Sequence, residues 1–265
     1  MDTSKRMRRR RLELALADVE SFLSMDEGWL LYEAARCSRS GRVAEIGSHK
    51  GRSTIALALG VVARGEGSVL AIDPFDAEID GERGDERLKQ FEQNLSRAQI
   101  ADRVVLRRQL SHDVAPSVAS GSLDVLFIDG SHEYEDVIQD IDDWMPKMVD
   151  GGLMLFNDPV IAEVGWALRD RVATRESKLR RAALVRNTLL TYYLPSAPWT
   201  FRDETRRVRL RVLLPFLWRF VQAIERLGTG GRFKRIAAFG AFCVGRTLIF
   251  VMLPGARLGQ ELSGR

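Results

Sequence analysis

Short apolar runs alternate along this chain with longer segments in which apolar residues recur every three or four positions. Runs of roughly 4–8 apolar residues that are bounded by glycine or charged residues are typical of buried β-strands. The pattern predicts strands at residues 42–46, 68–73, 103–107, 123–129 and 152–157. A hairpin near residues 181–194 is expected to follow them.

The segments with helical spacing separate these strands. They predict helices over residues 7–24, 26–37, 52–63, 85–99, 135–148 and 162–174. Strands that alternate with helices form a parallel sheet, because each helix carries the chain back across one face of the sheet. We therefore expect an α/β fold with a doubly wound sheet, and a ligand at the carboxyl ends of its strands.

The turn after the first expected strand carries the most specific chemistry. Glu45 ends an apolar run, and two glycines, Gly47 and Gly51, precede a helical pattern. A dinucleotide site needs a further glycine between these two, so that the backbone can approach a pyrophosphate. His49 occupies that position. The turn therefore favours a nucleoside cofactor without a pyrophosphate, and Asp73 at the end of the second strand is placed to accept its ribose hydroxyls.

Oxygen-bearing side chains also follow the fourth and fifth expected strands. Asp129 ends one apolar run, with His132 three residues later, and Asn157 and Asp158 end the next. If these strands are neighbours, their tips lie ~5 Å apart. Carboxylate and amide oxygens suit Mg²⁺. In the alternative reading, Asp129 caps the following helix and residues 157–159 form an ordinary turn.

Composition limits the class of protein. The chain has 265 residues, and its cysteines are Cys37 and Cys243, far apart in the sequence. This usage excludes a cysteine-rich metal site and fits a reducing compartment, so we expect a cytoplasmic protein. The basic stretch at the N-terminus is followed by Glu13, Asp18 and Glu20 rather than by an apolar run, which argues against a signal peptide.

Charge is distributed unevenly. Residues 201–265 hold 13 Lys+Arg and 4 Asp+Glu, a net charge of +9, whereas the rest of the chain has a net charge of −5. The basic part also contains many large apolar residues, and Arg246 lies near the middle of its second apolar segment, residues 233–253. A central arginine costs about 2.5–3.5 kcal/mol on insertion scales, which disfavours a transmembrane span. We expect amphipathic helices that bind an anionic membrane surface from the cytoplasmic side, pack on the body of the protein, or form a homodimer.

The sequence thus divides into an N-terminal helical segment (1–37), a cofactor-binding domain (38–194) and a basic, apolar helical extension (195–265).

The series Glu45-x-Gly47-x-x-x-Gly51-x-Ser53, followed by a strand that ends in Asp73, resembles the S-adenosylmethionine site of class I methyltransferases. The resemblance covers roughly residues 26–194. It implies the Rossmann-like sheet of that family. It also implies cofactor contacts by Glu45, Gly47, Ser48, Gly51, Ser53, Asp73, Ser111 and Asp129. Ser111 can equally be read as a helix N-cap.

The second set of residues resembles the metal-dependent O-methyltransferases, especially the macrolide-sugar enzymes of the macrocin type. The resemblance implies a Mg²⁺ site at Asp129, Asn157 and Asp158, with Asp129 and His132 as catalytic residues and His132 as the general base. Catechol O-methyltransferase has a lysine near this point, so His132 favours a sugar hydroxyl in a glycoside, glycolipid or polysaccharide as the acceptor.

Three other functions stay open at this stage. The acceptor could be a phenol or catechol, or the protein could be a non-catalytic scaffold that keeps the fold. The arginines at both ends would suit an RNA methyltransferase, but nucleic acid is disfavoured because the body is acidic and an Asn-Pro-Pro-aromatic motif is missing.

Overall fold

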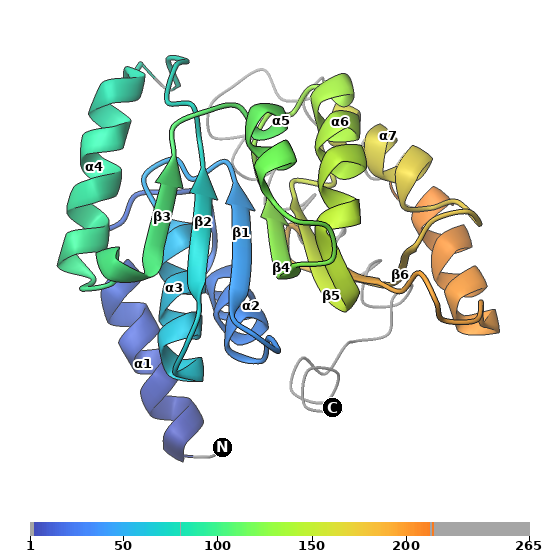
Figure 1. The fold of residues 1–265 in the computed structure, drawn as a ribbon, viewed down its shortest axis with the longest axis horizontal. Helices are drawn as coiled ribbons and strands as arrows, with labels where there is room; N and C mark the ends of the chain where they lie inside the picture. Colours follow the sequence, from blue (N-terminus) through green and yellow to red (C-terminus); the bar gives the residue numbers. More distant parts are fainter. Residues whose placement is uncertain (1–2, 80, 213, 215–265) are drawn as a thin grey trace, which may run out of the picture.

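A computed structural model describes residues 3–79, 81–212 and 214 of the chain. Its centre is a seven-stranded sheet with the strand order β3-β2-β1-β4-β5-β7-β6 (Figure 1). Strands β1 to β5 are parallel, and the β6–β7 hairpin adds two antiparallel strands beside β5. The strands are β1 (Arg42–Ile46), β2 (Ser68–Ile72), β3 (Val104–Arg107), β4 (Leu123–Ile128), β5 (Met148–Asn157), β6 (Leu179–Val185) and β7 (Thr188–Tyr193).

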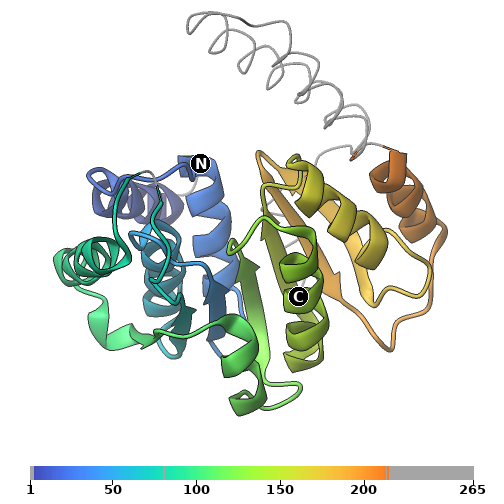
Figure 2. The same cartoon turned by 90° about the horizontal axis from the view of Figure 1, so that it is seen from above.

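Helices cover both faces of the sheet, so the doubly wound α/β fold expected from the sequence is confirmed (Figure 2). The helices are α1 (Thr3–Leu16), α2 (Met25–Arg36), α3 (Arg52–Arg64), α4 (Gly84–Arg97), α5 (Ser111–Val114), α6 (Tyr134–Trp144) and α7 (Ala162–Arg171). Single 3-10 turns lie at Ala101–Arg103, Ala115–Ser117 and Met145–Lys147. A further helix covers residues 201–212.

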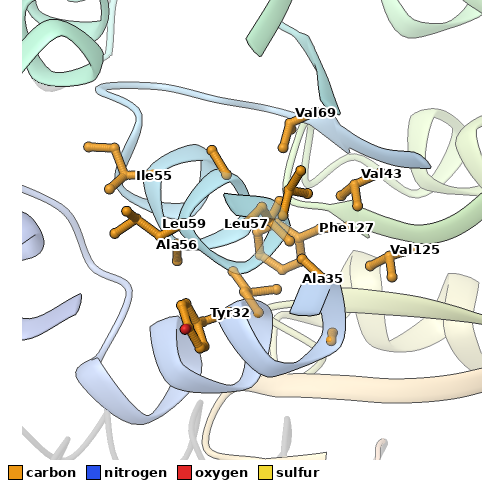
Figure 3. Close-up of a cluster of buried hydrophobic side chains, with 14 of the residues drawn as sticks. Tyr32, Ala35, Val43, Ile55, Ala56, Leu57, Leu59, Val69, Val125 and Phe127 are labelled. Atoms are coloured by element: carbon orange, nitrogen blue, oxygen red, sulfur yellow. The ribbon is translucent and has the colours of Figure 1, made fainter. Parts of the chain in front are cut away.

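Alternate residues of the strands supply two hydrophobic cores, one on each face. Val43, Val69 and Phe127 point toward α2 and α3 (Figure 3). The backbones of these two helices come close together at Gly60, where an added Cβ would lie 2.3 Å from the carbonyl oxygen of Tyr32. The first core also includes Leu12 and Leu16 of α1, so the N-terminal helices pack on the sheet rather than apart from it.

The first helix is shorter than the sequence pattern predicts. It ends at Leu16 instead of residue 24, because the Arg52 guanidinium binds the carbonyl oxygens that a longer helix would use. Arg52 Nη1 donates to the oxygens of Leu16 at 2.6 Å and Val19 at 2.7 Å. A new helix, α2, then begins behind the N-cap Ser24.

The boundary between the helix at 135–148 and the strand at 152–157 was also predicted wrongly. Helix α6 ends at Trp144, and β5 already begins at Met148. Pro146 lies in the 3-10 turn between them, and its ring and missing N–H prevent the helix from continuing.

The beginning of the basic extension packs on the body of the protein. Leu210 and Leu214 are each 3% exposed and belong to the core that α6 and α7 cover. Among the described residues, no helix combines the length and the apolar composition needed to cross a bilayer. The second apolar segment of the extension, residues 233–253 with Arg246, lies outside the described residues.

Candidate active site

Most of the predicted site residues lie at the carboxyl ends of β1, β4 and β5. Strand β4 pairs with both β1 and β5, so the residues that follow these three strands meet at one edge of the sheet. The connections from β1 and from β4 leave in opposite directions, to β2 and to β5. Doubly wound sheets bind their ligands at such a switch in strand order.

The turn after β1 needs its first glycine for two reasons. Gly47 has φ +84°, a conformation that side chains disfavour, and an added Cβ would lie 2.0 Å from the carbonyl oxygen of Asp129. This close approach brings the turn directly against the residue that follows β4, with the Asp129 N–H donating to the Ile46 carbonyl at 2.8 Å. Gly51, with φ +87°, is the N-cap of α3.

Glu45 lies beneath this turn and is completely buried. Its Oε2 accepts hydrogen bonds from the hydroxyls of Ser48, at 3.0 Å, and Thr54. Burial raises the pKa of this carboxyl to about 7, although the hydroxyls of Ser53, Thr54 and Ser48 lower it. Glu45 and Ser53 therefore shape the turn from below, and a contact between Glu45 and a cofactor stays a prediction.

Asp73 is partly exposed beside the same turn. Its Oδ2 accepts the backbone N–H groups of Ser48 at 3.0 Å and His49 at 2.9 Å. Its Oδ1 accepts the N–H of Phe75 at 2.9 Å. A carboxylate offers about four acceptor positions, so Asp73 keeps capacity for ribose hydroxyls while it holds the turn.

Asp129, His132 and Asp158 form the acid–histidine cluster, in which one potential ligand atom from each residue lies within 4.8 Å of the other two. His132 Nε2 is 3.5 Å from Asp158 Oδ2 and 4.0 Å from Asp129 Oδ1. The His132 side chain is 42% exposed, whereas those of the two acids are 26% and 22% exposed. The histidine thus faces solvent at the mouth of the site, with the acids below it.

The surroundings of the acid–histidine cluster disfavour the ionised form of both carboxyl groups. Burial raises the pKa of Asp129 well above its ordinary value, and the nearby Asp158 carboxyl raises it further. Burial likewise raises the pKa of Asp158, while His132 lowers it. A side-chain hydrogen bond from Asn157 partly compensates at Asp129. A divalent cation would favour the ionised form of both acids, so this donor set fits a metal such as Mg²⁺.

Of the two structural alternatives for these residues, the helix cap at Asp129 is wrong and the turn after β5 is present. Glu133 rather than Asp129 is the N-cap of α6. Residues 158–161 do form a turn, in which the Ile161 N–H donates to the Asp158 carbonyl at 2.9 Å. This turn holds Asp158 at φ +51°, beside Asp129.

Three residues that the sequence did not indicate support the site: Glu27, Asn187 and Thr188. The side-chain amide of Asn187, in the turn between β6 and β7, donates to Asp158 Oδ1. Glu27 of α2 is 3% exposed, and its Oε1 accepts the Asn187 N–H at 3.0 Å. The Thr188 hydroxyl lies 3.2 Å from the same oxygen and 3.3 Å from Asn157 Oδ1. The Ser24-x-x-Glu27 capping box was a recognisable helix signal, but no local pattern links Asn187 to Asp158.

Ser111 binds an acid that does not belong to the acid–histidine cluster. It is the first residue of α5, whose N-cap is Leu110, and its hydroxyl donates to Asp140 of α6. Burial raises the pKa of Asp140 to about 6. The N-cap reading of Ser111 is therefore wrong, and its contact with a cofactor stays a prediction.

Part of the chain is similar to a known protein family. Residues 44–159, which contain the glycine turn, Asp73 and the acid–histidine cluster, match a family described as "Methyltransferase domain". The predicted resemblance of this segment to methyltransferases is thereby confirmed.

The curated relatives of this chain are distant. Catechol O-methyltransferase of Mycobacterium tuberculosis is 34% identical over 111 residues, 42% of this chain and 46% of that protein. The uncharacterized protein y4gI of Sinorhizobium fredii is 27% identical over 146 residues, 53% of this chain and 15% of that protein. The chain thus spans less than half the length of either relative.

Solved structures share the fold. The O-methyltransferase TomG from Streptomyces achromogenes, which is involved in tomaymycin synthesis and was solved with S-adenosylmethionine, has a TM-score of 0.52 and 17% identity. The match covers 73% of this chain and 91% of that one. At this identity the likeness concerns the arrangement of helices and strands alone.

Proposed function

We propose that this protein is an S-adenosylmethionine-dependent O-methyltransferase that uses a divalent cation and methylates a hydroxyl group, that of a sugar in a glycoside, glycolipid or polysaccharide. The observation that carries the proposal is the acid–histidine cluster on a methyltransferase domain, next to the glycine turn. The carboxylates can hold a cation, the histidine can accept a proton, and the turn can bind the cofactor. Together these groups suit methyl transfer to an oxygen atom.

The residues around the turn support S-adenosylmethionine as the cofactor. Asp73 retains acceptor capacity for ribose hydroxyls, and His49 occupies the position where a pyrophosphate site needs a glycine. A positively charged sulfonium beside Glu45, Asp129 and Asp158 would favour their ionised forms, which burial disfavours by raising their pKa values. S-adenosylmethionine supplies a methyl group that is already activated by that sulfonium.

The chain's own residues account for the activation of the acceptor. A divalent cation held by Asp129, Asn157 and Asp158 would lower the pKa of an acceptor hydroxyl. His132 is exposed at the mouth of the site and can take the proton at Nε2. The rigid ends of β1, β4 and β5 then hold the acceptor beside the methyl donor, which is catalysis by proximity.

The identity of the base favours a sugar over a phenol, because a histidine stands where catechol O-methyltransferase has a lysine. A phenol or catechol is the second candidate acceptor. The observation in its favour is the 34% identity with the mycobacterial catechol O-methyltransferase over 111 residues.

Transfer of a labelled methyl group to panels of glycosides and catechols, with Mg²⁺ and with excess EDTA, tests the proposal. We expect transfer to glycosides with Mg²⁺ and none with EDTA. Transfer to catechols alone would establish the second candidate. Full activity in EDTA would mean that Asp129 and Asp158 are structural, and transfer to neither panel would support a non-catalytic scaffold.

A further inference from the structure

The helix at residues 201–212 has two distinct faces. Its inner face contacts the body through Leu210 and Leu214, and Asp203 on the same face is only 6% exposed. On the opposite face Phe201 is 86% exposed, Val208 46% and Val212 62%. These three residues are spaced by seven and four positions, so they form one stripe along the helix. We call this stripe the outer face.

The start of the helix has a local cap, and the residue before the cap contacts the body. The Thr200 N–H donates to Asp203 Oδ2 at 3.0 Å, and the Asp203 N–H donates to Thr200 Oγ1 at 3.2 Å. Just before this cap, the Arg180 guanidinium lies 5.1 Å from the centre of the Trp199 ring. Phe201 is therefore presented to solvent by an anchored helix.

Positive charge flanks the outer face. Arg202 and Arg209 lie along one side of it and Arg211 along the other, as the helical spacing dictates. The acidic residues of the helix are engaged elsewhere, since Asp203 caps it and Glu204 pairs with Arg207 at 2.7 Å and Arg175 at 3.2 Å. Within the described part of the chain, neither Arg202 nor Arg209 forms an ion pair.

We propose that the outer face docks on an anionic lipid membrane, with the helix lying in the plane of the interface. Apolar side chains between arginines match such a surface, because the apolar groups enter the headgroup region while the guanidinium groups meet lipid phosphates. The sequence beyond residue 214 has the same character, with 8 Lys+Arg, 2 Asp+Glu and the run Phe216-Leu217-Trp218. The proposal goes beyond methyl transfer and does not depend on it.

Two other occupants fit the outer face less well. A second copy of the chain would bring the same arginines together across a two-fold interface, where they repel each other. A nucleic acid would satisfy the arginines but would leave Phe201, Val208 and Val212 facing a charged backbone. An anionic bilayer complements both the charge and the apolar stripe.

Co-sedimentation with vesicles of phosphatidylcholine and phosphatidylserine, at low salt and with the full chain, tests the proposal. Two glutamates on the outer face, in the variant Phe201→Glu/Val208→Glu, should weaken binding at least about tenfold. The matched control is Phe22→Glu, since Phe22 is 91% exposed but lies far along the chain, between α1 and α2. It should bind like the parent, and vesicles of phosphatidylcholine alone should bind the parent weakly.

Several results would overturn the proposal. One is a parent protein that does not sediment with anionic vesicles. Another is unchanged binding of the double variant, which would place membrane contact elsewhere on the chain. An equal loss in Phe22→Glu would mean that any added charge has the same effect. If light scattering showed that the double variant separates a dimer without any vesicle binding, the outer face would be a contact between two copies.

Discussion

The Glu45 carboxyl, beneath the turn after β1, has a raised pKa that makes the stability of the fold depend on pH. Burial raises the pKa of its carboxyl from 4.5 to about 7. Between these two values the folded protein holds a proton that the unfolded chain has released. Glu45 therefore contributes stability that is fully present below about pH 4.5 and is lost as the pH rises toward 7.

The variant Glu45→Gln should remove this pH dependence, because glutamine keeps the size of the side chain but has no proton to lose. The free energy of unfolding of the parent, relative to the variant, should fall by up to about 3 kcal/mol between pH 4.5 and pH 7.5. Urea unfolding of the cofactor-free proteins measures this difference in the free energy of unfolding. The variant Glu92→Gln, at an exposed position, is the control. Parallel curves for parent and Glu45→Gln would contradict the assignment.

His132 is the second residue whose role can be isolated. If it is the base, His132→Ala should lower the rate of methyl transfer about 10²–10⁴-fold and leave the affinity for S-adenosylmethionine unchanged. Because Nε2 lies 3.5 Å from Asp158, the histidine could also bind the metal. Mn²⁺ titration followed by electron paramagnetic resonance separates the two roles. A rate like that of the parent from pH 6 to pH 9 would exclude His132 as the base.

At the scale of the elements, the β6–β7 hairpin and α2 position the acids of the site. Asn187 joins the hairpin to Asp158, and Glu27 joins α2 to Asn187. Arg186, in the same turn, pairs with Asp26 of α2 at 2.5 Å. The N-terminal helices thus reach the site through the hairpin, although 160 positions separate Asp26 from Arg186 in the sequence.

Removing the amide of Asn187 should loosen Asp158. Asn187→Ala is expected to weaken Mn²⁺ binding about 10–100-fold, the usual effect of losing a partner of a metal ligand. Electron paramagnetic resonance measures the affinity without any need for turnover. Asn94→Ala provides a control, because that amide binds the Lys50 carbonyl at 2.8 Å and not the cluster. Equal Mn²⁺ affinity in parent and Asn187→Ala would show that Asp158 needs no such support.

The strands were predictable because each is a compact apolar run with a clear boundary. β1 was placed at its observed limits, Arg42–Ile46, and β4 ends within a residue of its prediction. The end of α1 was not predictable, since it depends on Arg52, which lies 36 positions from Leu16. The end of α6 could have been found, because Pro146 follows it in the sequence.

Across the whole molecule, the sequence alone predicts that residues at the ends of neighbouring parallel strands lie close together. Asp129, Asn157 and Asp158 do meet, because β4 and β5 are adjacent in the sheet. Asn187 could not be predicted in the same way. It reaches the site from an antiparallel hairpin, whose register depends on long-range pairing between Asn157 and Thr188.

Calorimetric titration of the full chain tests whether the carboxyl edge of this sheet binds S-adenosylmethionine. We predict one binding site with a Kd in roughly the micromolar range. Asp73→Ala should weaken binding about 5–150-fold, because it removes the ribose acceptor and frees the N–H groups of Ser48 and His49. Asp76→Ala, an exposed acid in the following loop, should bind like the parent. No binding by the parent, or equal affinity in the parent and Asp73→Ala, would contradict the account.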